Sequence, residues 1–327
     1  MNLKRLQNMP NTRIGKILNL VWLFRGYAPF SPRFVELLLT YRCNLNCEFC
    51  YQARNKRDKF PDMSLEDAAR IEQNIRRSFL FKPRIHFFGG EPTVNKDFIG
   101  ILRYFSGKNY KLSLTTNGIN LKYLAKELAA TTGLLEINLS LNTMERGAAL
   151  PLLELFKKYR QREKININLA CPINIGNQAN LAGMVKEYEM SPANSLTFQH
   201  PTFISGPGPK VDPNVIRAQV EEIKAKKKKI PVLFLPDIKP DDIEKYYADP
   251  AFPYNKNRCV FPWFVLFIQP NGDIIPCDEV EVKMGNAKLE RLNRIWNGDN
   301  YRRFRSEIIK HGISHPICGR CCHRQYY

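Results

Sequence analysis

Long apolar runs and an export signal are both missing from this sequence. No apolar run reaches the roughly 18 residues that span a bilayer. No small-residue cleavage site follows the apolar stretch near the N-terminus. The histidines number only five, and His311 and His315 are the one pair within five residues of each other. We therefore expect a cytoplasmic globular protein, and neither an integral membrane protein nor a secreted domain held by disulfides.

Acidic residues are scarce relative to basic ones. The 327-residue chain has 50 Lys and Arg against 31 Asp and Glu, which gives a formal net charge of +19. Such a surplus suits an anionic partner, for example a phosphorylated metabolite, an acidic lipid surface, nucleic acid or an acidic peptide. A basic surface kept for solubility explains the charge equally well.

Cysteine is plentiful and unevenly distributed. All but one of the nine cysteines fall in three zones, which are Cys43/Cys47/Cys50, Cys259/Cys277 and Cys318/Cys321/Cys322. Clustered thiols in a chain of this size without an export signal indicate metal ligands, and thiolate sets favour zinc or iron–sulfur clusters. Cys171 stands alone inside an apolar run, so we expect it to be a buried core residue.

Strand and helix patterns alternate through the first two thirds of the chain. The predicted strands are residues 34–40, 84–88, 111–116, 136–141, 165–170 and 195–199. Helical patterns lie between them, the first with Ser64 as its N-cap. Six such units imply a parallel sheet with right-handed crossovers. Because the strands read as near-continuous apolar runs, they fit a sheet covered on both faces or a barrel.

The remaining segments have patterns of their own. Apolar residues recur at helical spacing over residues 11–26, which predicts a helix that packs on the main domain or lies on a membrane surface. Near the C-terminus, the turn at Asn271-Gly272 predicts a β-hairpin and residues 289–310 a helix. The predicted division is a basic amphipathic segment over 1–32, the barrel over 33–212, a helix and Pro-rich linker over 213–258, and a small domain over 259–327.

Cys43, Cys47 and Cys50 follow the first predicted strand on a loop. Four-iron clusters ordinarily take four cysteines, so a set of three leaves one iron open. An open coordination position is typical of a catalytic metal. A structural zinc site is the alternative from spacing alone, although no fourth ligand lies nearby in the sequence.

The loop from Cys43 to Tyr51, CNLNCEFCY, resembles the signature of the radical S-adenosylmethionine (SAM) superfamily, with Phe49 as the aromatic residue before the last cysteine. Gly89-Gly90-Glu91-Pro92, after the second strand, resembles the family's motif for the SAM amino group. Its glycines let the backbone approach, and Glu91 offers acceptors to an ammonium group.

Further positions extend the resemblance along the strand ends. It assigns Ser140 to the SAM ribose and makes Asn117 and Arg146 further candidates for SAM binding, Arg146 for the carboxylate. The resemblance implies a partial TIM-like barrel whose open iron binds SAM. An electron from a reductant such as flavodoxin or ferredoxin then cleaves SAM, and the 5′-deoxyadenosyl radical abstracts a hydrogen atom from the substrate.

The C-terminal cysteines resemble the SPASM or twitch extension found in a large radical SAM subgroup. Cys259-x12-Gly272-x4-Cys277 matches its beginning, and Cys318-x2-Cys321 its later half. The resemblance assigns these four cysteines to one auxiliary four-iron cluster suited to electron transfer, with Cys322 as the alternative to Cys321. A zinc site with four thiolates that braces a small domain is the other interpretation.

The substrate is the least defined part of the prediction. We expect a small anionic metabolite or a lipid, with a ribosomal peptide or a protein as the alternative. Dehydrogenation, cross-linking and epimerisation all remain open. Asn142, Gln199 and His200 stand at strand ends as candidate catalytic residues, and His200 is suited to moving a proton. A zinc-stabilised, basic nucleic-acid-binding protein is a more distant alternative, and we expect no specific nucleic acid partner for the enzyme.

Overall fold

One sheet runs through the whole computed structural model, which describes residues 26–47, 50, 60–141, 149–159, 165–201, 211–249, 259–312, 318 and 321. The strand order is β10-β9-β8-β1-β2-β3-β4-β5-β6-β7, parallel from β8 to β7, with β9 and β10 antiparallel. The strands are β1 (Phe34–Leu38), β2 (Arg84–Phe88), β3 (Leu112–Thr116), β4 (Leu134–Ser140), β5 (Asn166–Pro172), β6 (Ser195–Gln199), β7 (Val232–Leu235), β8 (Val265–Ile268), β9 (Asp273–Ile275) and β10 (Gly285–Asn286).

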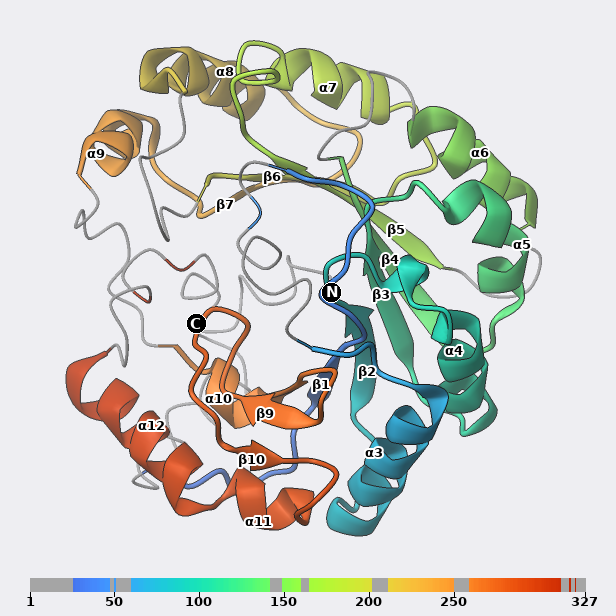
Figure 1. Cartoon of the computed structure of the whole chain (residues 1–327). Helices are drawn as coiled ribbons and strands as arrows, with labels where there is room; N and C mark the ends of the chain where they lie inside the picture. Colours follow the sequence, from blue (N-terminus) through green and yellow to red (C-terminus); the bar gives the residue numbers. More distant parts are fainter. Residues whose placement is uncertain are drawn as a thin grey trace.

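The longer helices of the barrel lie around the outside of the curved sheet (Figure 1). The helices are α3 (Leu65–Ser78), η3 (Pro92–Val94), α4 (Phe98–Gly107), α5 (Leu121–Ala130), α6 (Ala149–Tyr159), α7 (Leu181–Tyr188), α8 (Pro213–Ala225), η4 (Pro240–Asp242), α9 (Ile243–Ala248), α10 (Phe261–Phe264), α11 (Leu292–Trp296) and α12 (Asp299–His311). None of the described helices is long and apolar enough to cross a bilayer. The arrangement confirms the predicted α/β class and partial barrel.

Alternate residues of each strand face opposite sides of the sheet, and the core lies on the convex side. Val35, Leu37, Ile85 and Phe87 are fully buried there, in one apolar cluster with the helices. Cys171 belongs to the same cluster and is fully buried, which confirms its predicted place in the core. The concave face is left for other residues.

Two predicted segments differ from the structure. We predicted a linker with little regular structure after α8, but Val232–Leu235 form β7, parallel to β6, and α9 follows. We predicted one helix over 289–310, but it is divided into α11 and α12 at Asn297 and Gly298. The division has a physical cause, because the Asn297 side chain bonds both backbone groups of Ala28, at 2.8 and 3.0 Å, instead of continuing a helical face.

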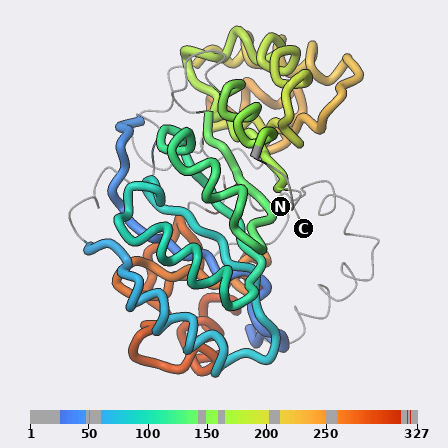
Figure 2. Tube along the Cα trace, turned by 90° about the vertical axis from the view of Figure 1, so that its right-hand side faces the viewer, coloured from blue at the N-terminus to red at the C-terminus, as the bar shows by residue number. Residues whose placement is uncertain are grey.

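The C-terminal segment joins the edge of the barrel. Strand β8 pairs with β1, with Glu36 opposite Phe267. Figure 2 shows the C-terminal elements beside the N-terminal strands, although they are far apart in the sequence. The indole of Trp296 donates to the Phe30 carbonyl at 2.8 Å, and that of Trp263 to the Tyr27 carbonyl at 3.2 Å. The amphipathic helix predicted within residues 11–26 lies outside the described residues, apart from its last position.

A buried arginine holds this C-terminal segment together. The Arg305 side chain of α12 is fully buried, with its guanidinium 4.5 Å from the centre of the Trp296 ring. It donates to the carbonyls of Pro262 at 2.8 Å and Trp296 at 2.7 Å. We infer that these bonds lock α10, α11 and α12 to one another, because buried carbonyls need donors.

Replacing Arg305 with alanine is expected to destabilise the protein, because it leaves two buried carbonyls without a hydrogen-bond donor and opens a cavity. We expect the free energy of unfolding to fall by about 3 kcal/mol. Thermal or denaturant unfolding of the anaerobically purified protein measures this. Arg302→Ala is the matched control, since that side chain is exposed on the same helix. Equal stability of the two variants would contradict the assigned role.

Candidate functional site

The three-cysteine loop begins at the carboxyl end of β1. The side chains of Cys43, Cys47 and Cys50 are all half-buried. The loop is turned tightly, because the Cys50 N–H donates to the Cys47 carbonyl at 3.1 Å and the Leu45 N–H approaches the Cys43 sulfur at 3.4 Å. Phe49 lies outside the described residues.

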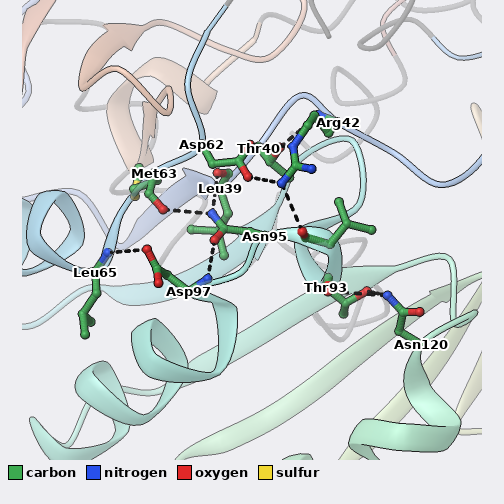
Figure 3. A network of polar contacts seen from close by, with 11 residues as sticks. Leu39, Thr40, Arg42, Asp62, Met63, Leu65, Thr93, Asn95, Asp97 and Asn120 are labelled. Carbon is green, nitrogen blue, oxygen red and sulfur yellow. Dashed lines mark hydrogen bonds and ion pairs between the residues drawn. The ribbon is translucent and has the colours of Figure 1, made fainter. Parts of the chain in front are cut away.

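A polar network fixes the start of this loop (Figure 3). The Asp62 carboxylate accepts from the Thr40 hydroxyl at 2.5 Å and pairs with the Arg42 guanidinium. Arg42 also donates to the Val94 carbonyl at 3.2 Å. These three side chains join the end of β1 to the segments before α3 and after β2, so the residue preceding Cys43 is held from two sides.

Asn95 also connects the end of β1 to the segments before α3 and after β2. Its amide nitrogen donates to the carbonyls of Leu39 and Met63, each at 2.9 Å, and its oxygen accepts from the Asp97 N–H at 2.8 Å. The side chain is 3% exposed. Sequence reasoning missed Asn95, because an asparagine after a turn carries no sign of such distant partners.

The two glycines after β2 bring that strand against the cysteine loop. The Gly90 N–H donates to the Thr40 carbonyl at 2.8 Å, and the Glu91 N–H to the Arg42 carbonyl at 2.9 Å. A Cβ on Gly90 would lie 2.3 Å from the Arg42 oxygen, and one on Gly89, at φ +153°, would lie 2.4 Å from the Thr40 oxygen. Only glycine fits so close an approach.

The Glu91 carboxylate is fully buried and bonded within the protein. One oxygen accepts from the Thr93 hydroxyl at 2.6 Å and the Thr116 hydroxyl at 2.8 Å, and the other accepts from the Asn117 N–H at 2.7 Å. Burial raises the pKa of Glu91, and these bonds partly offset the rise. The carboxylate therefore ties the end of β2 to the end of β3, and its contact with the SAM ammonium group stays a prediction. Pro92, also buried, begins η3 directly after it.

Asn117 reaches the cysteine loop from the end of β3. Its amide nitrogen lies 2.8 Å from the Asn44 side-chain oxygen and 3.8 Å from the Cys43 sulfur. Hydrogen bonds to the thiolates of a cluster tune its reduction potential. Ser140 and Gln199 lie half-buried at the ends of β4 and β6, at the same edge of the sheet. Asn142 and Arg146 lie outside the described residues.

His200 follows β6 but is buried among aromatic side chains. It is 3% exposed, and its Nδ1 lies 2.8 Å from the Tyr247 hydroxyl. Burial lowers the pKa of His200 to about 3, and Lys224 acts in the same direction. The imidazole is therefore neutral near pH 7. Its Nε2 has no hydrogen-bond partner among the described residues.

The C-terminal cysteines gather beside β8 and β9. Burial raises the pKa of Cys277 well above its ordinary value, and Asp278, Cys259 and Cys321 add to the rise through their proximity. Apolar side chains surround the pair Cys259 and Cys277 in a separate cluster. The Cys321 N–H approaches the Cys318 carbonyl at 3.4 Å. Cys322 lies outside the described residues, and no three Cys, His, Asp or Glu among those described converge tightly enough for a single metal ion.

The fold and the site define a partial α/β barrel with one thiol group at its mouth and a second beside it. The sequence model of the radical SAM superfamily matches residues 37–185, and that of the SPASM iron–sulfur cluster-binding domain matches residues 259–322. The chain therefore carries a radical SAM domain, followed by a C-terminal SPASM domain.

Curated relatives share shorter stretches with this chain. It is 40% identical over 92 residues to 7,8-dihydro-6-hydroxymethylpterin dimethyltransferase of Methanocaldococcus jannaschii, covering 27% of this chain and 18% of the relative. It is 38% identical over 112 residues to a probable GTP 3′,8-cyclase of Pyrococcus abyssi, covering 34% of this chain and 35% of the relative. An S-adenosylmethionine-dependent nucleotide dehydratase of Selenomonas ruminantium is 35% identical over 99 residues, covering 29% and 35%. The matches thus span 18% to 35% of these relatives' lengths.

Solved structures share the fold over most of the chain. Streptococcus suis SuiB bound to its precursor peptide SuiA superposes with a TM-score of 0.64 at 17% identity, covering 88% of this chain and 69% of that one. Native anSMEcpe with bound AdoMet superposes with a TM-score of 0.60 at 17% identity, covering 84% of this chain and 82% of that one. At this level of identity the likeness shows the fold.

The family assigns SAM and four-iron clusters to this chain as cofactors, and the residues present fit them. Cysteine side chains stand in both matched regions, and the Asn117 amide lies 3.8 Å from the Cys43 sulfur. When bound, the first cluster supplies the electron that cleaves SAM. The protein's part is to hold the thiolates, orient SAM and keep water away.

Glu91→Gln distinguishes the two roles considered for this residue. The amide would place a donor against a buried N–H or hydroxyl, so we expect the free energy of unfolding to fall by about 1–3 kcal/mol. If the carboxylate also binds the SAM ammonium group, the Kd for SAM should rise as well. Thermal unfolding and SAM equilibrium dialysis on the same preparation separate these results, with exposed Glu66→Gln as the control.

Proposed function

We propose that this radical SAM enzyme abstracts a hydrogen atom from its substrate and uses its auxiliary cluster to transfer an electron during turnover. The observation that carries the proposal is the pairing of β8 with β1, which brings the two cysteine regions to adjacent strands. Cys43 follows β1, and Cys277 follows β9 in the hairpin that β8 begins. Electron transfer between the two sites would cross this part of the sheet.

A pocket lies between the two cysteine regions and supports the proposal. Leu38 and Tyr41 from the end of β1 form one side, and Phe267, Gln269 and Asp278 form the other. The Gln269 amide donates to the Tyr41 hydroxyl at 2.7 Å across it. Its walls are mostly apolar, and its volume of about 10 Å³ admits no more than a water molecule.

The substrate expected from the charge of the chain is a small anionic metabolite or a lipid. A peptide or protein substrate is the alternative, and the fold shared with peptide-bound SuiB favours it as the second candidate. A nucleic-acid-binding zinc protein is set aside, because the family models match both cysteine regions. Electron supply by a flavodoxin or ferredoxin, and membrane contact through residues 11–26, belong to this proposal.

Anaerobic purification tests the proposed function. We expect brown protein with about eight irons per chain, as two four-iron clusters require. Addition of a reductant and SAM should release 5′-deoxyadenosine and methionine. Cys171→Ala is the control for cysteine removal, since this buried thiol lies in neither group, and it should keep the full iron content. Colourless, zinc-loaded protein without SAM cleavage would overturn the proposal.

A further inference from the structure

A hydrogen-bonded row of polar side chains crosses the concave face of the sheet. The row comprises Ser195, Asn168, Asn138, Thr115, His86 and Ser113, which come from five adjacent strands, β6 to β2. The bonds measure 2.9 Å from Ser195 to Asn168, 3.2 Å from Asn168 to Asn138, and 3.4 Å from Asn138 to Thr115. Thr115 lies 3.0 Å from His86 Nε2, and Ser113 lies 2.8 Å from His86 Nδ1.

The bonds of the polar row all run in one direction. The Ser195 hydroxyl donates to Asn168, the Asn168 amide to Asn138, and the Asn138 amide to Thr115. The Ser113 hydroxyl approaches the Ile85 carbonyl at 3.5 Å, so we assign the His86 proton to Nδ1, which leaves Nε2 to accept from Thr115. Burial lowers the pKa of His86 to about 3, so the row carries no charge near pH 7.

Spare hydrogen-bonding capacity remains along the polar row. Each asparagine has used one amide hydrogen and one lone pair of its oxygen for the row, so one of each is left. Asn138, Asn168, Thr115 and Ser195 are only partly buried, which distinguishes them from the sealed convex face. Interiors of closed barrels are filled mainly by bulky apolar residues, so a polar concave face indicates contact with something polar.

Cations are nearly absent from this part of the molecule, despite the basic character of the whole chain. Strands β1 to β6 contain one Lys or Arg, which is Arg84. Its guanidinium lies 3.8 Å from the Glu136 carboxylate, at the opposite end of β2 from the cysteine loop. Glu36, 3.8 Å from His86, adds an acid to the face. The strand residues therefore offer no site for a phosphate group, which prefers paired cations.

We propose that the polar row binds the substrate through hydroxyl groups, so that the part of the substrate inside the sheet is uncharged and polyhydroxylated. This rests on the proposed function, because it names the substrate of the same site. A hydroxyl both donates and accepts at one atom, and so satisfies the amide hydrogen and the lone pair that an asparagine has left. A single peptide group presents its donor and acceptor on opposite sides, whereas one hydroxyl carries both, and a peptide probe tests the alternative of an extended chain.

The polar row also lies within reach of the reaction. Thr115 lies on β3, two residues before Asn117, which follows the end of the strand and contacts Asn44 and Cys43. Two residues of a strand span about 7 Å. A ligand of the size of a sugar, held by Thr115 and Asn138, would therefore extend to the cysteine loop. An anionic substituent on such a substrate would extend away from the sheet, toward the basic remainder of the chain.

Equilibrium dialysis of the anaerobic holoenzyme with SAM and no reductant tests the proposal. The probes are glucose and myo-inositol, their monophosphates, and a short uncharged peptide, each at millimolar concentration. We expect a polyol to bind at least as tightly as its phosphate. Asn168→Ala should weaken polyol binding about tenfold, the loss of roughly 1.4 kcal/mol. Asn166→Ala is the matched control, because it lies two residues earlier on the same strand and is exposed.

Other results would overturn the proposal. These are the absence of polyol binding, tighter binding of the phosphates with no effect of Asn168→Ala, or Asn168-dependent binding of the peptide alone. If Asn168→Ala loses iron, Ser195→Ala at the end of the row takes its place and is expected to weaken binding in the same way. Wild-type SAM cleavage is measured in parallel. If SAM cleavage fails, the proposed function is wrong. If SAM cleavage is normal and no polyol binds, only the proposal of a hydroxyl-binding row is wrong.

Discussion

Cys47→Ala is expected to abolish formation of 5′-deoxyadenosine, whereas Cys277→Ala should retain part of it, uncoupled from substrate conversion. Each substitution removes one thiolate from one group, so iron should fall from about eight to about four per chain in both variants. We propose that only the first group supports SAM cleavage, so its loss should leave nothing to start the reaction. Iron analysis, with chromatography of 5′-deoxyadenosine and product, measures both effects.

The comparison of these two variants depends on intact folding. Circular dichroism and thermal unfolding establish this, and Cys171→Ala reports the effect of removing a cysteine elsewhere. Equal loss of SAM cleavage in Cys47→Ala and Cys277→Ala would show that the C-terminal group stabilises the structure and does not take part in electron transfer.

Gly90→Ala is expected to cause loss of the first iron–sulfur cluster, although the substitution removes no thiolate. The new methyl group would lie 2.3 Å from the Arg42 carbonyl oxygen and 2.6 Å from that of Tyr41, so the two backbones must separate. Separation breaks the bonds from the Gly90 and Glu91 N–H groups to Thr40 and Arg42. We expect iron to fall toward about four per chain, with SAM cleavage nearly lost.

Gly107→Ala is the matched control for this substitution. Gly107 ends α4, and no heavy atom lies within 4 Å of the position a Cβ would take. Alanine is favoured over glycine in helices by about 1 kcal/mol, so this variant should be as stable as the wild type or more so. Full iron content and activity in Gly90→Ala would mean that the cysteine loop binds its cluster without the close approach of the Gly90 backbone.

The sequence predicted the barrel well because its convex strand residues and helix caps are local signals. The predicted N-cap Ser64 is confirmed, with its hydroxyl 3.0 Å from the Asp67 N–H. Strand β7 was missed because four apolar residues between Pro231 and Pro236 show no period. A short run between two prolines looks like a linker until the neighbouring strand is seen.

The site was predicted less completely, since its contacts join residues distant in sequence. The cysteine groups could be read from spacing, but the anchoring of their loop by Asp62 and Asn95 depends on tertiary contacts. The polar row was also hidden. We took the strands as near-continuous apolar runs, and only the register between strands shows that Asn138 and Asn168 lie side by side.

The pairing of β1 with β8 also bears on how the chain folds. Phe34 lies opposite Val265, so the first strand of the barrel completes its hydrogen bonding only after most of the chain has been synthesised. Until then one edge of β1 is open, and open strand edges are sites of aggregation. A chain truncated before residue 259 should therefore be poorly soluble even if its barrel helices form, and the metal-binding domain would serve as the barrel's edge cover as well.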